Sequence, residues 1–178
     1  MVALSRLLLV VLLAPLCAVA QSERSAEIQI KAAFLYKFGE FVQWPEASFA
    51  HPDGPFAIGI MNADELASSL EQLVVNRTVH GRPVAVRRLR RGESPAGLHI
   101  LFIGQSESAR LGDILATARG HAVLTVTESE NAIVSGSMIN FVAEERKVRF
   151  DVALPPAERG QLKISARLLA VARKVMTS

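Results

Sequence analysis

The sequence has almost no cysteine: among its 178 residues only Cys17 carries a thiol. Cys17 lies in an N-terminal segment that we predict to be removed, so residues 21–178 hold neither a thiol nor a disulfide. This absence excludes a cysteine nucleophile and disulfide-based control from that part of the chain. The hydrophobic core alone must therefore stabilise the fold, and the remaining length suffices for one domain with such a core.

The common catalytic signatures are missing as well. The chain has no G-x-S-x-G elbow, no Walker A loop and no G-x-G-x-x-G fingerprint. Its histidines are far apart, and none has the i, i+4 spacing of a zinc-binding helix. We therefore expect a protein that is not an enzyme, with no catalytic residue, no metal site and no cofactor.

The chain also lacks a strong charge of either sign. Its 20 Lys and Arg residues outnumber its 17 Asp and Glu residues by three, and loss of Arg6 with the N-terminal segment would leave a net charge of +2. This balance is too mild to favour nucleic-acid binding. The densest basic cluster, residues 87–91, is predicted to end a strand, whose side chains alternate between two faces. We favour a solvated strand end over a contact with an acidic partner or with phosphate groups.

The N-terminus is typical of a cleaved secretory signal peptide. Arg6 supplies the positive charge, Leu7–Leu13 is an apolar run, and residues 18–20 form an A-x-A cleavage site. The apolar run is too short to span a bilayer comfortably, and Pro15 interrupts it. We predict that residues 1–20 are removed, that the mature chain starts at Gln21, and that it resides in the periplasm.

Short apolar runs alternate with amphipathic segments in residues 28–178. The order predicts a single compact α/β domain, with a mainly parallel sheet flanked by helices, preceded by a loose polar segment at residues 21–27. The expected helices are residues 28–44, 62–75 and 108–118, with Asn62 capping the second. The expected strands are residues 56–61, 83–91, 99–103, 122–126, 138–142 and 148–154.

The last quarter of the chain is expected to form a β-hairpin followed by a packed C-terminal helix. Residues 143–147 have hairpin-loop length, and Pro155-Pro156 should stop the second strand because proline cannot donate to a sheet ladder. After Gly160, apolar residues from Leu162 to Val175 recur with helical spacing. The hairpin should add an antiparallel edge to the sheet.

Two groups of residues are candidates for contact with a protein partner. Phe41 and Trp44 lie with Phe49 near the end of the first predicted helix, where large aromatics indicate either a core edge, which we favour, or an interface anchor. The second group is the basic face expected on the last helix, which consists of Lys163, Arg167 and Lys174.

A small-ligand site is the alternative to a protein-binding surface. In open α/β sheets, ligands bind beyond the carboxyl ends of the strands, where this chain carries Asn62, Ser106 and Thr127. The same residue types also cap helices, and we favour that ordinary explanation.

Three stretches together resemble the YfiR family of periplasmic proteins. They are KAAFLYKFGEFVQWP (residues 31–45), HILFIG with the later VLTVTE (residues 99–104 and 123–128), and the segment from Ser135 to Val175. Their order and spacing extend the resemblance over nearly all of the mature chain. The chain departs from the family at His99, where many members have a cysteine, and it lacks the disulfides that some members carry.

The resemblance implies a regulator with a compact α/β fold that tends to form homodimers. Such proteins look like repressors that bind the periplasmic region of an inner-membrane diguanylate cyclase and hold its cytoplasmic domain inactive. Release through an outer-membrane lipoprotein would raise cyclic-di-GMP and favour biofilm formation. The second hypothesis is a periplasmic small-ligand-binding sensor module for another membrane signalling protein.

Overall fold

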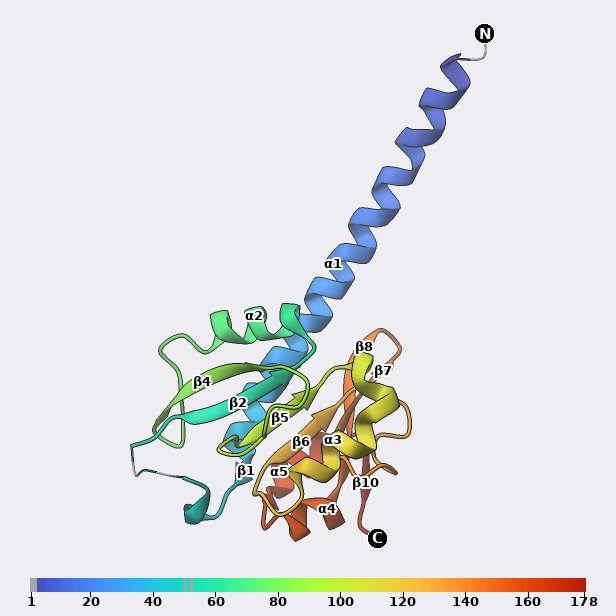
Figure 1. The fold of residues 1–178 in the computed structure, drawn as a ribbon. Coiled ribbons are helices and arrows are strands. Elements are labelled where there is room, and N and C mark those ends of the chain that lie inside the picture. Colours follow the sequence, from blue (N-terminus) through green and yellow to red (C-terminus); the bar gives the residue numbers. More distant parts are fainter. Residues whose placement is uncertain (1–2, 50, 52) are drawn as a thin grey trace.

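The computed structural model describes the backbone of residues 3–49, 51 and 53–178, and side chains in these ranges from residue 21 onward. The chain forms a long first helix, an eight-stranded sheet and several short elements (Figure 1). The elements in chain order are α1 (Ala3–Phe41), β1 (Val42–Gln43), η1 (Glu46–Ser48), β2 (Phe56–Met61), α2 (Asp64–Leu73), β3 (Thr78–Val79), β4 (Arg82–Leu89), β5 (Ile100–Ile103), η2 (Gln105–Arg110), α3 (Leu111–Ala118), β6 (Leu124–Thr127), β7 (Ile139–Glu144), β8 (Lys147–Ala153), α4 (Leu154–Arg159), β9 (Lys163–Ile164), α5 (Ala166–Val171) and β10 (Lys174–Met176).

The large sheet has the strand order β10-β8-β7-β6-β5-β2-β4-β3. The neighbouring strands β4, β2, β5, β6 and β7 run parallel to one another, whereas β8 pairs antiparallel with β7 and β3 pairs antiparallel with β4. A separate small sheet joins β1 to β9. The predicted mainly parallel α/β domain with a C-terminal hairpin is therefore confirmed.

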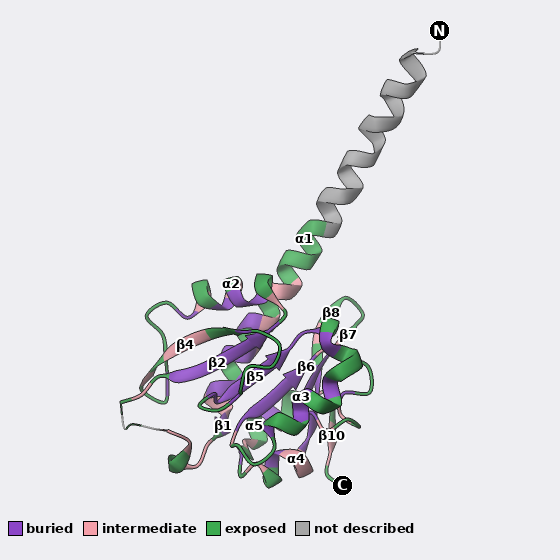
Figure 2. Ribbon diagram, in the orientation of Figure 1, coloured by how far each residue is buried: buried purple, intermediate pink, exposed green. Residues whose placement is uncertain are grey.

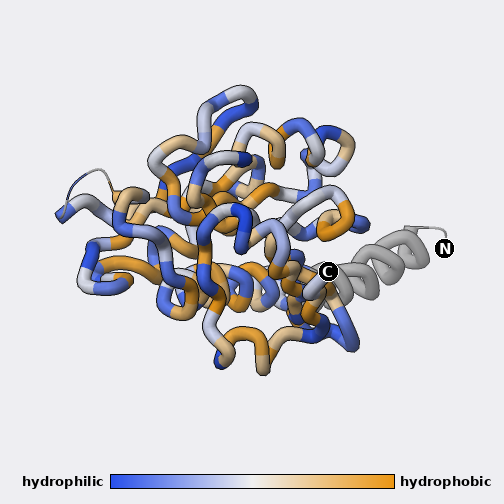
Figure 3. The backbone as a smooth tube through the Cα atoms, turned by 90° about the horizontal axis from the view of Figure 1, so that it is seen from below, coloured by the Kyte–Doolittle hydropathy of each residue, from blue (hydrophilic) through white to orange (hydrophobic). Residues whose placement is uncertain are grey.

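Helices cover both faces of the sheet. One face packs against α1 and α2, and the other against α3 (Figure 1). Alternate side chains of the central strands point to opposite faces of the sheet. Ile58 and Ile60 belong to the hydrophobic core on the side of α1 and α2, whereas Ala57 and Met61 belong to the core on the side of α3. The central strands are accordingly buried throughout (Figure 2). Hydrophilic residues are found at many outer loops (Figure 3). This is the pattern expected of parallel strands covered on both sides.

A cluster of four phenylalanines joins the first helix to the terminal hairpin. Phe34 and Phe38 of α1 lie against Phe141 of β7 and Phe150 of β8. The Phe38 and Phe150 rings meet edge to face, with centroids 5.2 Å apart. Such pairs contribute about 0.5–1.5 kcal/mol beyond the area that they bury. Phe34 and Phe38, one helical turn apart, thus pack α1 against the hairpin strands β7 and β8.

The start and end of the first helix differ from the prediction. Residues 21–27 were expected to lie outside regular structure, but they belong to α1. Helix-favouring residues occupy this segment, and Glu27 forms an i, i+4 ion pair with Lys31. The helix ends at Phe41 rather than near Trp44, because Val42 and Gln43 pair with β9. The predicted signal peptide, residues 1–20, lies outside the residues whose side chains are described.

The predicted C-terminal helix is present as α5, but its expected extent, from the residues after Gly160 to Val175, is wrong. The segment is divided into β9, α5 and β10, and only residues 166–171 are helical. Ser165 has an extended backbone and its hydroxyl accepts a hydrogen bond from Leu168 N at 3.3 Å, so it caps the start of α5. Val175, which the helical pattern had included, belongs to β10 and pairs with Val152. Apolar spacing alone did not reveal these boundaries.

One expectation about the hairpin is confirmed and another is corrected. Strand β8 ends at Ala153, just before Pro155 and Pro156, which occupy the first turn of α4, where a missing N–H costs no hydrogen bond. The hairpin does not form the edge of the sheet, because β10 pairs in parallel with β8 and covers it. The edge strands are instead the short β10 and the two-residue β3.

Candidate functional site

The parallel neighbours β2, β5 and β6 have their carboxyl ends side by side, and Lys31 of α1 reaches this edge of the sheet. Glu128 directly follows β6, and its carboxylate accepts from the Lys31 ammonium at 2.7 Å and from the backbone N–H of Gln105 at 3.2 Å. Burial by itself lowers the pKa of Lys31, but hydrogen bonds to Glu128 and Glu27 outweigh it and raise that pKa above its ordinary value. Lys31 thus remains charged and ties α1 to two strand ends.

Asn62 does not cap α2, contrary to the prediction. It has a left-handed backbone with φ of 51°, and Ala63 stands at the start of the helix instead. Its amide donates to the Glu107 carboxylate, which also accepts from Arg91 at 3.0 Å. The hydrogen bond from Arg91 lowers the pKa of Glu107. The backbone of Asn62 passes very close to Gly104. A side chain at residue 104 would not fit, since its Cβ would lie 2.5 Å from the Asn62 carbonyl oxygen.

The three residues proposed for a ligand do not share one site. Asn62 and Ser106 both line a surface groove of about 600 Å³ beside Lys31 and Glu128. Thr127 does not line this groove, because its side chain is fully buried on the sheet. Its hydroxyl lies within hydrogen-bonding distance of Ser137 Oγ at 2.9 Å and Asn140 Oδ1 at 2.8 Å. Thr127 therefore belongs to a buried polar network that joins β6 to β7.

The aromatic candidates lie at the small β1–β9 sheet. Gln43 pairs with Lys163 across it, and the backbone carbonyl of Phe41 accepts from Ser165 N at 3.0 Å. Trp44 and Lys163 line a shared hollow of about 530 Å³. We call this region, formed by Phe41, Trp44, Lys163 and Arg167, the β1–β9 surface. The fold thus brings Phe41, Trp44 and Lys163 together at this small sheet, and Arg167 lies on α5, the helix that directly follows β9.

Lys174 lies apart from the β1–β9 surface. It belongs to β10, at the edge of the large sheet, and lines a groove of about 760 Å³ together with Lys31 and Glu128. The expected basic face of one helix therefore does not exist, since only Arg167 is on α5. Among the described residues, Lys163, Arg167 and Lys174 form no ion pair, so their charges are available to a partner.

His99 supports the aromatic side of the β1–β9 surface from within the core. Its ring is stacked between Phe49 and Phe56, with centroids 4.4 and 4.8 Å away, and its Nδ1 accepts from the backbone N–H of Ala57 at 3.0 Å. Burial lowers the pKa of His99 to about 4, and the nearby Arg82 guanidinium acts in the same direction. The imidazole is therefore neutral near pH 7, with its proton on Nε2.

Two features of the sheet edges were not apparent from sequence. Asp151 of β8 is buried and binds Arg173 through two hydrogen bonds, of 2.8 and 2.5 Å, next to β10. This contact raises the pKa of Arg173. Within the basic cluster of β4, Arg88 pairs with Asp64 at 3.1 Å and with Glu71 at 2.9 Å. Residue type alone did not indicate either pairing, because the partners are distant in sequence.

The described residues contain no group of three or more His, Cys, Asp or Glu side chains arranged to hold a metal ion. In the same part of the chain, none of the helices has both the length and the apolar character required to cross a membrane.

Comparison with known proteins gives one informative match. A search of curated proteins gave no match to the chain. Protein-family models match residues 28–173 to a family described as YfiR/HmsC-like, which covers the domain from α1 to the residue before β10. This is a family of periplasmic regulators of cyclic-di-GMP signalling rather than of catalysts, and it implies interaction with a membrane diguanylate cyclase. The chain belongs to the YfiR/HmsC-like family.

Proposed function

We propose that this protein is a periplasmic repressor that binds the periplasmic region of an inner-membrane diguanylate cyclase and holds the enzyme inactive. The observation that carries the proposal is the family match, which extends over residues 28–173 and so over nearly the whole folded domain. Binding would lower cyclic-di-GMP and restrain biofilm formation. An outer-membrane lipoprotein that competes for the repressor would release the cyclase.

We propose the β1–β9 surface as the contact with the cyclase. Arg167 and Lys163 are exposed and have no ion-pair partner among the described residues. Val171 of α5 is 58% exposed, which adds an apolar side chain beside these charges. Basic groups around apolar contacts favour a protein partner that carries acidic residues, and unpaired charges at a rim accelerate association.

Trp44 contributes to this surface mainly by shaping it. The indole is partly buried and packs edge to face on Phe56, with ring centroids 4.9 Å apart. Its N–H donates to the backbone carbonyl of His99 and is not available to a partner. Lys163 and Arg167 are therefore the more direct candidates for energetic contact. Lys174 would join the interface only if the partner also reached the edge of the large sheet.

The proposed repressor is expected to act as a homodimer and to require no cofactor. Since residues 21–178 contain no cysteine, its release from the cyclase cannot depend on a disulfide within the mature chain. Competition among binding partners is then the simplest control.

The first test is co-purification from detergent-solubilised inner membrane of the source cells, with the tagged protein as bait. We expect recovery of a diguanylate cyclase, and loss of that recovery for the double variant Lys163→Glu/Arg167→Glu. Arg87→Glu is a control for a single charge reversal elsewhere on the protein, because Arg87 is exposed on β4 and has no ion pair among the described residues. Capture of a different membrane sensor, or equal recovery by both variants, would contradict the proposal.

A further inference from the structure

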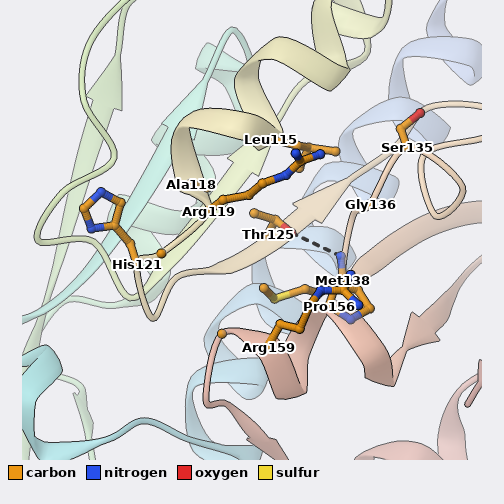
Figure 4. Close-up of a pocket in the computed structure, with 12 residues that line it drawn as sticks. Leu115, Ala118, Arg119, His121, Thr125, Ser135, Gly136, Met138, Pro156 and Arg159 are labelled. Carbon is orange, nitrogen blue, oxygen red and sulfur yellow. Dashed lines mark hydrogen bonds between the residues drawn. The ribbon is translucent and has the colours of Figure 1, made fainter.

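A separate pocket lies between α3, the loop before β7 and α4 (Figure 4). Its volume is about 470 Å³, within the range of small-molecule sites. It shares no lining residue with the β1–β9 surface or with the grooves at the carboxyl edge of the sheet.

The floor of the pocket is apolar. Leu115 and Ala118 reach it from α3, and Met138 from the segment before β7. Each of these residues is less than 8% exposed, so a ligand that touches them must enter a largely desolvated space. Methionine adapts its shape to irregular apolar groups, which suits a floor that contacts a variable ligand.

The rim is cationic. Arg119 enters from the end of α3 and Arg159 from the end of α4, on opposite sides of the pocket (Figure 4). In the part of the chain that the structure describes, neither guanidinium takes part in an ion pair or a side-chain hydrogen bond. The pocket lining contains no Asp or Glu, whereas each of the four other described pockets includes at least one.

A buried hydroxyl adds a third donor. Thr125 of β6 is 2% exposed and lines the pocket, and its Oγ1 accepts from the backbone N–H of Met138 at 3.1 Å (Figure 4). A threonine hydroxyl also donates one hydrogen. Among the described residues, no acceptor is assigned to that hydrogen. A buried donor without an acceptor is costly, so the pocket favours a ligand that provides one.

We propose that this pocket binds a small organic carboxylate with an apolar body. The guanidinium groups of Arg119 and Arg159 would hold the carboxylate, since planar guanidinium matches that group and forms charge-assisted hydrogen bonds. The apolar body would rest on Leu115, Ala118 and Met138, with the Thr125 hydroxyl donating to an oxygen of the ligand. The site is independent of the partner proposal, and a ligand would tune repression only if its affinity differed between free and partner-bound protein.

The test is calorimetric titration of the purified protein with 2-naphthoate, with 2-naphthylmethylamine as a probe of similar shape and opposite charge. We expect saturable one-to-one binding of the acid and none of the amine. Arg119→Gln and Arg159→Gln should each weaken binding about tenfold or more, the effect of losing one charge-assisted hydrogen bond. Arg87→Gln, a matched change on β4 outside the pocket, should leave binding unchanged.

A second measurement locates the ligand without any substitution. The ε-methyl NMR signal of Met138 should shift on addition of 2-naphthoate in proportion to the calorimetric saturation. The proposal is overturned if 2-naphthoate does not bind, if the amine binds equally well, or if both arginine variants bind like the unchanged protein. It is likewise overturned if binding occurs while the Met138 signal stays in place.

Discussion

Trp44 and His99 are joined by a hydrogen bond in which the indole Nε1 donates to the backbone carbonyl of His99 at 3.0 Å. The same carbonyl accepts from Leu124 N at 2.8 Å, so one oxygen links the residue after β1 to strands β5 and β6. The His99 ring lies between Phe49 and Phe56. The β1–β9 surface is therefore supported by the core of the parallel sheet.

Replacing Trp44 by phenylalanine should lower the free energy of unfolding. The substitution removes the indole N–H and part of the contact with Phe56, while the His99 carbonyl keeps its bond from Leu124. We expect a loss of about 1–3 kcal/mol, measured by urea denaturation. Unchanged stability would show that Trp44 does not support the surface.

The buried His99 should make stability depend on pH. In the unfolded chain histidine takes up a proton below about pH 6.5, whereas burial keeps the folded residue neutral to a pKa of about 4. The unfolded state then binds more protons, so the free energy of unfolding should fall as the pH drops from about 6.5 to 4, by at most about 3 kcal/mol.

The control for this prediction is His99→Asn, whose amide oxygen can replace Nδ1 as the acceptor for Ala57 N. Denaturation curves at several pH values should show a shallower fall in stability for the variant between pH 6.5 and 4. Parallel curves for the two proteins would mean that other groups cause the acid sensitivity.

The ion pair between Lys31 and Glu128 should couple α1 to the sheet energetically. The side chains are 14% and 21% exposed, so water screens the pair less than it would a surface pair. A double-mutant cycle with Lys31→Met and Glu128→Gln should give a coupling free energy of about 1 kcal/mol, reduced in part at high salt. A coupling free energy indistinguishable from zero would show that this ion pair does not stabilise the packing of α1 on the sheet.

Asp151 should hold β10 on the sheet through Arg173. Asp151→Asn leaves Arg173 without its two charged acceptor oxygens, and we expect a loss of about 1–3 kcal/mol. Hydrogen exchange should become faster at Lys174–Met176, while the amides of β5 keep their protection. Equal exchange of β10 in both proteins would indicate that backbone pairing with β8 alone retains the strand.

The sequence revealed the fold class because the central strands are short apolar runs separated by amphipathic helices. The divided C-terminus could not be predicted, since its boundaries depend on Ser165 as a cap and on β10 pairing with β8. The antiparallel pairing of β1 with β9, which gathers Trp44 and Lys163, is a contact between segments about 120 residues apart along the chain. No local pattern encodes such a pairing.

The candidate sites show the same division between local and long-range information. The strand ends were correctly placed at one edge, but the burial of Thr127 depends on its contacts with Ser137 and Asn140 of the following segment. Likewise, Asn62 has the right residue type for a helix cap, and only the approach of Glu107 assigns it another role.

The most direct test of the proposed function is diguanylate cyclase activity of the membrane partner, reconstituted with increasing amounts of this protein. We expect cyclic-di-GMP production to fall with saturable dependence on the unchanged protein and on Arg87→Glu. The double variant Lys163→Glu/Arg167→Glu should require at least tenfold more protein for the same inhibition. Cyclase activity that stays constant on addition of the unchanged protein would contradict the repressor proposal.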